Sequence, residues 1–472
     1  MSLSHRPTRS QACPPRLFPA LTNSSCLSAL LAVGTHRWLS IAALVLAALA
    51  APKASALGLA QAYEAALSND PQFRAAQAQA LAGAEALPQA VARLRPSVNL
   101  ATQNFRIHQD RTDGENKFPS QNYPSYNISL SARQPLYSPR LWRARDQAQA
   151  ATESAQAVLD FEQQALASRV ISTYANLALA YEQQALIQVQ QESASTRLQA
   201  ANRALQAGTG IRTDIDEIRA QLDLLQAQML QARQSIQASQ AELEQMTGKT
   251  ISQPIRLKPS VNPETLDPGM LQPWLDKATR QNPELLARQA QARAALAASQ
   301  VSRADHLPTL DLVVQVSKNS SENSFFVNSR TETQAVGLQV NLPLYQGGFL
   351  QSRDRQTAAE SVSAEEQAQR ALMSARIEVS KAFYALKEGV ARVRALENAV
   401  ASAEQVVLAN QKSFAAGLRS MLDILAAEQR AAQTRLDLAQ ARLQLVANQV
   451  RLEGLVGETS AQGFASLAAW FQ

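Results

Sequence analysis

Two long stretches without a proline constrain the fold of this chain more than any other feature. They cover residues 141–207 and 350–416. Proline interrupts a helix because it lacks the backbone N–H and crowds the preceding turn, so its absence allows each stretch to be a single helix. At 1.5 Å per residue such a helix extends roughly 100 Å. A compact globular domain has no place for helices of this length, so we expect an elongated helical body.

Each long stretch is followed by a short turn with glycine and then by a second helical stretch, expected over residues 211–247 and 420–455. Apolar residues recur there at alternating spacings of three and four, which is the pattern of a coiled-coil seam. The seam positions are Ile211, Ile215, Ile218, Leu222, Leu225, Met229, Ala232, Ile236, Ser239, Leu243 and Met246, and then Leu422, Leu425, Gln429, Ala432, Leu436, Ala439, Leu443, Val446 and Val450. The sequence therefore predicts two antiparallel helical hairpins.

Four shorter segments alternate between apolar and polar residues, which is the period of a strand with two different faces. They make two predicted β-hairpins, residues 97–137 and 309–345, and the alternation fails after Thr102, so we expect a bulge there. Strands of about ten residues with one apolar face are typical of a membrane barrel with a wet lumen, and a soluble two-sided sheet is the alternative. Aromatic residues at the strand ends favour the membrane: Tyr137, Trp142, Tyr345 and Phe349.

Four strands are too few to close a barrel, because small barrels need eight. After the N-terminal region, no stretch approaches the twenty consecutive apolar residues of a membrane-spanning helix. If the chain spans a membrane, it does so as a closed barrel, because backbone groups exposed to lipid must be hydrogen-bonded within the protein. Several copies must then share one barrel, which predicts an oligomer.

The chain repeats one design after residue 56. Pro71 and Pro283 each open a helical stretch, and a further proline follows each at the same distance, Pro96 and Pro308. Two more pairs of landmarks come in the same order, namely Pro135-Leu136-Tyr137 with Pro343-Leu344-Tyr345, and Gly208, Asp214 and Ile215 with Gly417, Asp423 and Ile424. We expect two structural repeats, residues 57–265 and 266–456, each with a short helix of about 25 residues, a β-hairpin, a long helix and a returning helix. Residues 457–472 are left over.

The N-terminus has the pattern of a cleaved signal peptide, residues 1–56. An apolar run over residues 41–51 is too short to span a bilayer, and small residues precede the expected cleavage after Ala56. This segment holds five basic residues and no acid, so cleavage lowers the net charge from +6 to +1. The basic character of the precursor is therefore no indication of nucleic-acid binding. Both cysteines, Cys13 and Cys26, also lie in this segment.

Residues that carry chemistry are scarce in the remaining chain. Its two histidines, His108 and His306, lie far apart, and no phosphate-binding loop, dinucleotide motif or nucleophile motif is present. The sequence therefore predicts neither an enzyme nor a metal or cofactor site.

The turns between the paired helices contain Gly208 and Gly210 in the first half and Gly417 and Leu418 in the second. Glycine commonly ends a helix because it adopts the left-handed conformation without strain. Thr213 and Ser420 lie close to the next helix starts and are candidate caps. Asp214 and Asp423 suit the positive end of the helix dipole, which is a purely structural explanation for both acids.

These landmarks together resemble the TolC family of outer-membrane export ducts, over nearly all of the chain after residue 56. The most specific pieces are the helix openings at Pro71 and Pro283, the segment from Leu342 to Gly348, and the two turns from glycine to Asp-Ile. The resemblance implies an α+β membrane protein and a homotrimer. Four strands per chain would form a twelve-stranded β-barrel, continued by a long α-helical coiled-coil barrel. A belt around its middle would use residues near 248–270 and 457–472.

The same resemblance implies a gate at the periplasmic tips. Thr213, Asp214, Phe414, Arg419 and Asp423 match the gate positions, with Arg419 as a latch that pairs with Thr213 or Asp214 of a neighbouring helix pair. Gly208, Gly210, Gly417 and Leu418 form the turns on which an adaptor docks. Phe414 replaces a latch tyrosine, and Ala426 replaces a second acid of the acidic ring. We therefore expect a looser and less cation-selective gate.

The function that the resemblance implies is a type I secretion duct in the bacterial outer membrane, extending into the periplasm. Its partners would be a periplasmic adaptor protein, an inner-membrane ABC transporter, outer-membrane lipid and an exported unfolded protein, such as a toxin of the adenylate cyclase–haemolysin kind. No cofactor and no nucleic acid are implied. The alternatives are the duct of a drug efflux pump and, from other classes, a periplasmic coiled-coil adaptor or a soluble coiled-coil scaffold.

Overall fold

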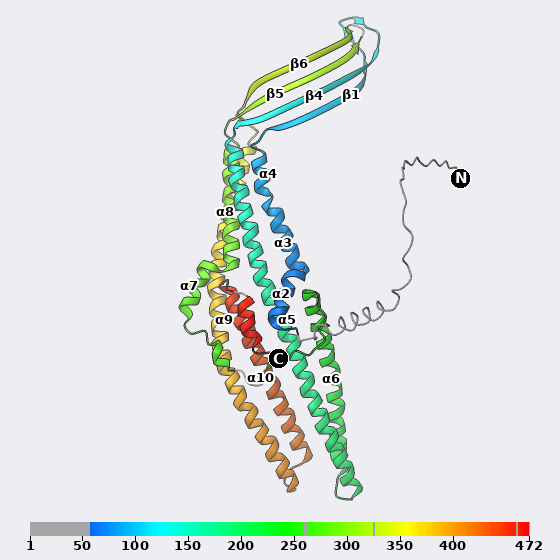
Figure 1. The fold of residues 1–472 in the computed structure, drawn as a ribbon, viewed down its shortest axis with the longest axis vertical. Coiled ribbons are helices and arrows are strands. Elements are labelled where there is room, and N and C mark those ends of the chain that lie inside the picture. The colour runs from blue at the N-terminus through cyan, green and yellow to red at the C-terminus, as the bar shows by residue number, and fades with distance from the viewer. Residues whose placement is uncertain (1–56, 259–261, 324–325, 459–460, 472) are drawn as a thin grey trace, which may run out of the picture. The chain divides into compact units, whose positions relative to one another are not determined.

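The computed structural model describes residues 57–258, 262–323, 326–458 and 461–471 (Figure 1). These residues belong to one compact unit, Ser55–Gln472. The signal peptide predicted over residues 1–56, with its two cysteines, lies outside the described residues.

Two helices run through most of this unit, α5 (Pro139–Gln206) and α9 (Phe349–Ala415), with 68 and 67 residues. The start of α5 follows from its sequence, because Pro139 suits the first position of a helix and the Ser138 hydroxyl accepts a hydrogen bond from the Leu141 N–H at 3.4 Å. The start of α9 follows Gly348, whose φ of 84° favours glycine.

The returning helices are α6 (Arg212–Thr247) and α10 (Met421–Leu455). Most seam positions predicted in α6 are buried, Ile215 and Ile218 among them. Two seam positions predicted in α10 are wrong, because Leu422 is 57% exposed and Gln429 is also exposed. Helix α10 packs against α5 as well as α9, so its buried face turns toward Met421 and Ile424 instead.

The N-terminal helices are α2 (Leu59–Asn69), α3 (Pro71–Ala84) and α4 (Ala86–Ala92). The single helix predicted from Pro71 is therefore broken near Glu85. Pro88 explains the break, because it lacks the N–H that would bond to the carbonyl of Ala84 and its ring crowds that carbonyl.

The second half begins with the 3₁₀ turn η1 (Pro263–Leu266), α7 (Leu271–Gln281) and α8 (Pro283–Ala304). Helices α3 and α8 start alike. The Asp70 carboxylate accepts a hydrogen bond from the Phe73 N–H at 2.8 Å, and the Asn282 amide oxygen accepts one from the Leu285 N–H at 2.9 Å. Each cap stands directly before a proline at the first helical position.

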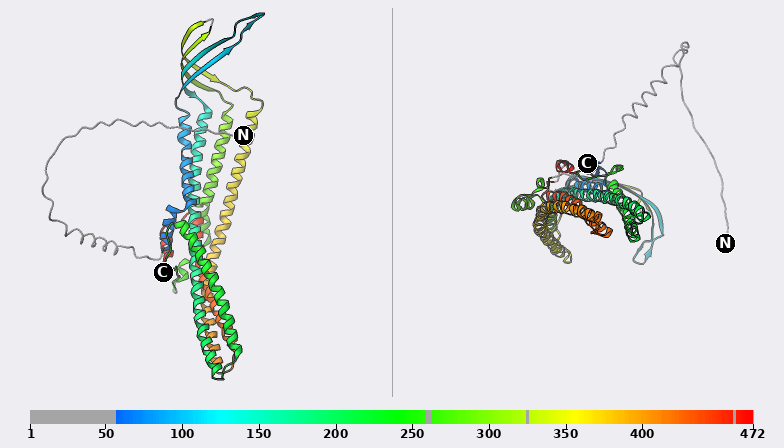
Figure 2. Two further views of the ribbon diagram at one scale, coloured as in Figure 1. Left: turned by 90° about the vertical axis from the view of Figure 1, so that its right-hand side faces the viewer. Right: turned by 90° about the horizontal axis from the view of Figure 1, so that it is seen from below.

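Each long helix has two successive partners along its length. Helices α3 and α4 pack against the half of α5 nearer the strands, and α6 packs against the other half; α8 and α10 divide α9 in the same way. Helix α5 also contacts α8 and α10. Seen along the helix axes, the helices of this unit follow a curved layer (Figure 2).

The sheet has four antiparallel strands in the order β1-β4-β5-β6. They are β1 (Ser97–Gln109), β4 (Gln121–Tyr137), β5 (Thr309–Asn323) and β6 (Phe326–Asn341). A short ribbon of β2 (Thr112–Asp113) and β3 (Asn116–Lys117) lies between the first two.

The bulge predicted after Thr102 is wrong, because β1 pairs with β4 without a shift from Ser97 to Gln109. The alternation fails there for a different reason. The far end of β1 carries polar residues, such as Asn104 and Arg106, on the face that is apolar nearer the helices. The register shifts lie elsewhere, between Pro135 and Tyr137 in β4 and near the end of β5.

The pairing register divides the sheet into two chemically different faces. One face is apolar near the helices, with Val98, Leu100, Leu130, Leu312, Leu338 and Val340. The other face carries amides and hydroxyls, with Asn99, Gln103, Ser129, Ser131, Gln315 and Gln339. Such a sheet is built to separate an apolar environment from a wet one.

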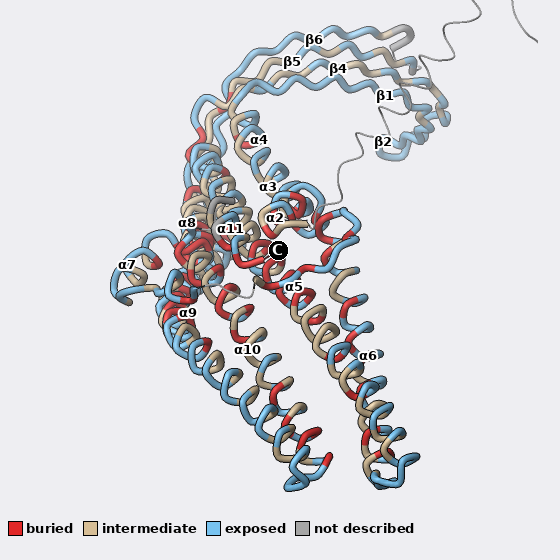
Figure 3. The backbone as a smooth tube through the Cα atoms, turned by 60° about the horizontal axis from the view of Figure 1, so that its bottom comes forward, coloured by how far each residue is buried: buried red, intermediate tan, exposed pale blue. Residues whose placement is uncertain are grey.

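The main apolar core lies where the partner helices of α5 and α9 meet end to end (Figure 3). It joins α2, the middle of α5 and α9, the ends of α6 and α10, and α11 (Ala461–Ala468). The rings of Tyr63 and Phe464 stack there with centroids 4.5 Å apart, and Leu257 bridges to Phe471. The described parts of the segments around residues 248–270 and 457–472 thus pack together at this level.

None of the helices in the described part of the chain has both the length and the apolar character needed to cross a membrane.

Candidate functional site at the helical tips

The first tip joins α5 to α6 through a tight turn. Gly208 has a φ of 75°, which favours glycine, and the N–H groups of Thr209 and Gly210 both donate to the carbonyl of Ala204 at 3.0 Å. A Cβ on Gly210 would stand 2.7 Å from the backbone nitrogen of Leu205. Both glycines are therefore required by the geometry of the turn.

The second tip joins α9 to α10 in a similar way. Gly417 has a φ of 76° and donates its N–H to the carbonyl of Phe414 at 2.8 Å, while the Leu418 N–H donates to the carbonyl of Ser413 at 2.9 Å. The side chain of Leu418 is 79% exposed. With the exposed Leu422 it gives this tip an uncovered apolar surface.

The two predicted helix caps behave differently. Ser420 caps α10 and forms a capping box with Asp423, in which each side chain bonds to the other residue's backbone N–H. The cap predicted at Thr213 is wrong, because α6 begins at Arg212 after Ile211 and has no side-chain cap. Thr213 is the second residue of the helix, whereas a capping side chain belongs to the residue just before the helix.

Within the described residues of one chain, Arg419 of the predicted gate pairs with Asp423 and not with the predicted latch partners Thr213 or Asp214. The Arg419 guanidinium lies 3.5 Å from the Asp423 carboxylate of its own turn. Hydrogen bonds from the N–H and hydroxyl of Ser420 lower the pKa of Asp423, and Arg419 lowers it further. Asp214 lies in the first turn of α6, and among the described residues it forms no ion pair.

Phe414 belongs to an apolar cluster that joins the two helical hairpins. The cluster contains Ile187 and Ala194 of α5, Ile218 and Leu225 of α6, and Met421 and Ile424 of α10, and Phe414 packs against it. Phe414 lacks the hydroxyl of the tyrosine that the family resemblance places here. Its ring contributes apolar contact with this cluster.

Directly beside this cluster, Arg197 of α5 forms an ion pair with Glu428 of α10. Their side chains are only 17% and 22% exposed, and Gln411 of α9 also donates to the Glu428 carboxylate at 3.4 Å. The second terminal nitrogen of Arg197 is buried without a hydrogen-bond partner in the described structure. Burial raises the pKa of Glu428 more than Arg197 and Gln411 lower it.

This pair was not predicted from the sequence, although a signal for it exists. Glu428 lies on the face of α10 that carries Met421, Ile424 and Ala431, all of them buried. A carboxylate on a buried stripe needs a cation, because an unpaired buried charge is costly. The stripe was missed because the predicted seam ran through Leu422 and Gln429 on a different face.

Among the described residues, no three histidine, cysteine, aspartate or glutamate side chains gather as metal ligands.

The model of the outer membrane efflux protein family matches residues 62–249 and 274–458 of this chain. The chain belongs to this family. The proteases secretion protein PrtF of Dickeya chrysanthemi is 30% identical over 91% of this chain and 94% of its own length. The alkaline protease secretion protein AprF of Pseudomonas aeruginosa is 32% identical over 89% of this chain and 88% of its own. The solved CmeC outer membrane channel of Campylobacter jejuni superposes with a TM-score of 0.73 at 17% identity, covering 96% of this chain and 98% of that one.

Membership of the outer membrane efflux protein family confirms the predicted resemblance, the α+β fold class and the location. The chain is an outer-membrane export channel protein that extends into the periplasm. The family is one of channels and not an enzyme class. The roles of the gate residues and of the docking turns remain predictions.

Proposed function

We propose that three copies of this chain form one duct, through which a type I secretion system passes an unfolded protein across the periplasm and the outer membrane. The observation that carries this proposal is the open sheet with one apolar and one polar face. Within the described residues, β1 pairs only with β4 among the four long strands, and β6 pairs only with β5. Two long edges are thus left without partners.

Unpaired strand edges are not tolerated in lipid, because every backbone N–H and C=O there must be hydrogen-bonded. Pairing β1 of one copy with β6 of the next removes both edges. Three copies then give the twelve strands that the family resemblance implies. The apolar face of the sheet meets lipid, and the amides and hydroxyls line a wet passage.

The helices continue this passage into the periplasm. Helices α5 and α9 each span roughly 100 Å at 1.5 Å per residue. Their far tips carry the exposed Leu418 and Leu422, a surface suited to a helical hairpin of an adaptor protein. An ABC transporter in the inner membrane would supply the unfolded cargo at the same end.

Secretion is favoured over drug efflux by the relatives. PrtF and AprF are both named as protease secretion proteins, and each covers most of this chain. The proposed cargo is therefore a secreted protein, and a toxin is one form of it. Drug efflux is the second candidate, because the family is described as one of outer membrane efflux proteins. The adaptor and the soluble scaffold gain no support, because the chain belongs to a channel family.

Two measurements test the proposal. Deletion of the gene should remove one or a few proteins from the culture supernatant and leave drug susceptibility unchanged; the opposite pattern would favour the efflux pump. The trimer is tested with cysteine pairs, one in β1 and one in β6, scanned along both strands. Both native cysteines lie in the predicted signal peptide, so the introduced ones stand alone. Covalent trimers on denaturing gels are expected, and a chain that remains monomeric at every pair would refute the shared barrel.

A further inference from the structure

A hollow lies where the sheet meets the helices. It has a volume of about 620 Å³ and is lined by the last turns of α4 and α8, the first turns of α5 and α9, and the adjoining ends of all four long strands. Four arginines and two aspartates are the only charged residues that line it in the described structure: Arg93, Arg95, Arg133, Arg140, Asp305 and Asp311. The wall therefore carries an excess of positive charge.

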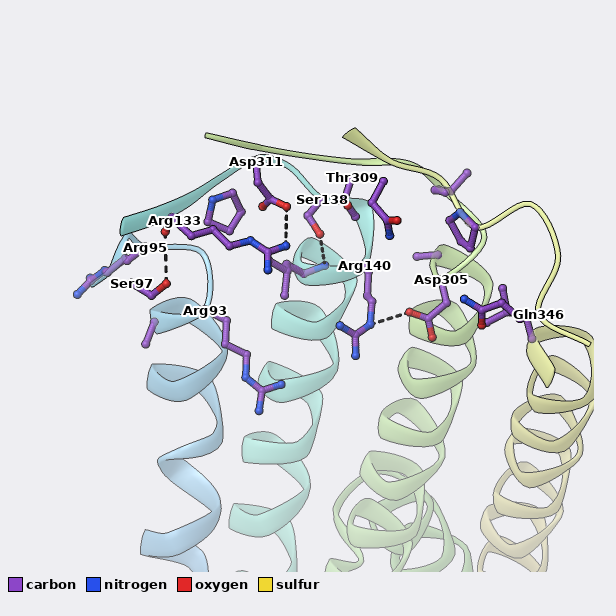
Figure 4. Close-up of a pocket in the computed structure, with 18 of the residues that line it drawn as sticks. Arg93, Arg95, Ser97, Arg133, Ser138, Arg140, Asp305, Thr309, Asp311 and Gln346 are labelled. Atoms are coloured by element: carbon purple, nitrogen blue, oxygen red, sulfur yellow. Dashed lines mark hydrogen bonds and ion pairs between the residues drawn. The ribbon is translucent and has the colours of Figure 1, made fainter. Parts of the chain in front are cut away.

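Two of the arginines are neutralised within the chain. Arg133 lies 2.5 Å from Asp311, whose side chain is 4% exposed, and the Nε of Arg140 lies 2.6 Å from Asp305 (Figure 4). The other two, Arg93 and Arg95, are exposed, and neither forms a side-chain hydrogen bond or ion pair among the described residues. Arg93 stands at the end of α4, where a cation suits the helix dipole. That role does not apply to Arg95, which lies beyond the helix.

The hollow opens on the polar face of the sheet. Ser97 pairs with Arg133, and Pro135 pairs with Asp311, so these side chains share the face that carries Asn99 and Gln315. On this face, from the helix ends as far as Asn127 and Asn319, Arg133 and Asp311 are the only charged residues of the described strands. The positive charge is thus concentrated at one level of an otherwise neutral surface.

We infer that Arg93 and Arg95, supported by Arg133 and Arg140, form a cationic collar that binds acidic segments of a polypeptide. The inference rests on the proposed function, in which the polar face lines the passage and three copies repeat the collar around it. An extended acidic peptide fits better than a small anion. The free arginines are exposed on a wide wall, whereas a compact ion is held by donors that converge on one point.

The collar would act on passage through the channel. Each carboxylate of the peptide can pair briefly with the arginines of one copy and then with those of the next, because exposed charge pairs are individually weak. Screening limits the attraction to about 8 Å at physiological salt, so only groups inside the passage are affected. The collar therefore favours acidic over basic stretches without holding either permanently.

Current block in planar bilayers tests the inference, with poly-L-glutamate as the probe. The wild-type channel should be blocked from the strand side by poly-L-glutamate and much less by poly-L-lysine. In Arg93→Gln/Arg95→Gln the block by poly-L-glutamate should weaken about tenfold. Raising the salt concentration should narrow the difference in block between the wild type and this variant. Arg106→Gln is the matched control. It makes the same change on the opposite face of β1, and it should keep the wild-type block.

Several outcomes would overturn the collar. These are equal block by the two polymers, undiminished block in the double variant, or block by tripolyphosphate without block by poly-L-glutamate, which would indicate a small-anion site. A wild-type protein that forms no channel would instead refute the proposed function. The collar is then still tested by calorimetric titration of the detergent-solubilised protein with poly-L-glutamate, in which the double variant should bind about tenfold more weakly than Arg106→Gln.

Discussion

Arg197 of α5 and Glu428 of α10 form an ion pair that connects the two helical hairpins of the chain, 231 residues apart in sequence. The pair lies beside the apolar cluster that contains Ile218, Leu225 and Met421. It therefore stands where the hairpins must separate if the tips are to open.

Replacing Arg197 with methionine should loosen this connection. The variant leaves the partly buried Glu428 carboxylate with the amide of Gln411 as its remaining partner among the described residues, and we expect a loss of about 1–3 kcal/mol from the hairpin contact. Single-channel conductance should rise. Arg203→Met is the control, because Arg203 lies in the same helix and its side chain, among the described residues, bonds only to the Gln199 carbonyl of its own turn. Equal conductance in the two variants would show that Arg197 has no role in gating.

Glu428 should make the joined state depend on pH. Burial raises its pKa above the ordinary value of about 4.3, whereas water returns it toward that value when the hairpins separate. At a pH between these two pKa values, Glu428 is protonated in the joined state and ionised in the separated state. Lowering the pH through this window therefore stabilises the joined state. Open probability should fall as the pH is lowered toward the ordinary Glu pKa of about 4.3, and Glu428→Gln should flatten this dependence. A rise on acidification in the wild type would contradict the assignment.

Arg419→Ser tests the latch that the family resemblance implies. Among the described residues of one chain, Arg419 forms an ion pair only with Asp423 of its own turn, so a latch to Thr213 or Asp214 would require a neighbouring copy. If that role exists, the variant should show a larger conductance. Arg212→Ser offers a matched change at the other tip, where Arg212 lies near Asp216 of its own helix. An unchanged small conductance in Arg419→Ser counts against the latch.

Ser420→Ala should destabilise the start of α10, because it removes the cap that accepts the Asp423 N–H. Loss of such a cap costs about 1 kcal/mol. Thr213→Ala is the paired comparison, since α6 has no side-chain cap, and its effect should stay within about 0.5 kcal/mol. Thermal unfolding and hydrogen exchange over residues 421–424 measure both. Similar losses in the two variants would mean that Ser420 does not act as a cap.

Gly83→Ala should weaken the contact between α3 and α5. A Cβ at this position would stand 2.6 Å from the Cβ of Ala155, so the helices must move apart. Overpacking of this kind costs about 1–3 kcal/mol. Gly337→Ala serves as the reference, because its added Cβ meets no atom within 4 Å. A melting temperature that is lowered equally in both variants would argue against close packing at Gly83.

Local signals predicted most of the helices and strands, and tertiary contacts explain the failures. The absence of proline over residues 141–207 and 350–416 was sufficient to expect α5 and α9. The break near Glu85 also has a local signal in Pro88, which interrupts the helix that begins at Pro71. The seam of α10 was misplaced because a heptad pattern identifies one buried face, whereas α10 has two neighbours in α9 and α5.

The candidate site was less accessible to prediction than the fold. The glycines of the turns can be recognised from the local sequence. The capping box follows from the spacing between Ser420 and Asp423. The Arg197–Glu428 pair depends on how two hairpins lie against each other. The sequence of neither helix identifies the partner residue in the other helix. The signal in the sequence is a carboxylate on a face of α10 that is otherwise apolar.

The end-to-end meeting of the partner helices has a mechanical consequence. At the level of the main core, α3 gives way to α6 and α8 gives way to α10, and only α5 and α9 continue through. At this level the interrupted helices are joined by side-chain packing in the main core, to which α2, α7 and α11 contribute. A force applied at the tips therefore reaches the strands along two routes, through the uninterrupted α5 and α9 and through the side chains of the main core.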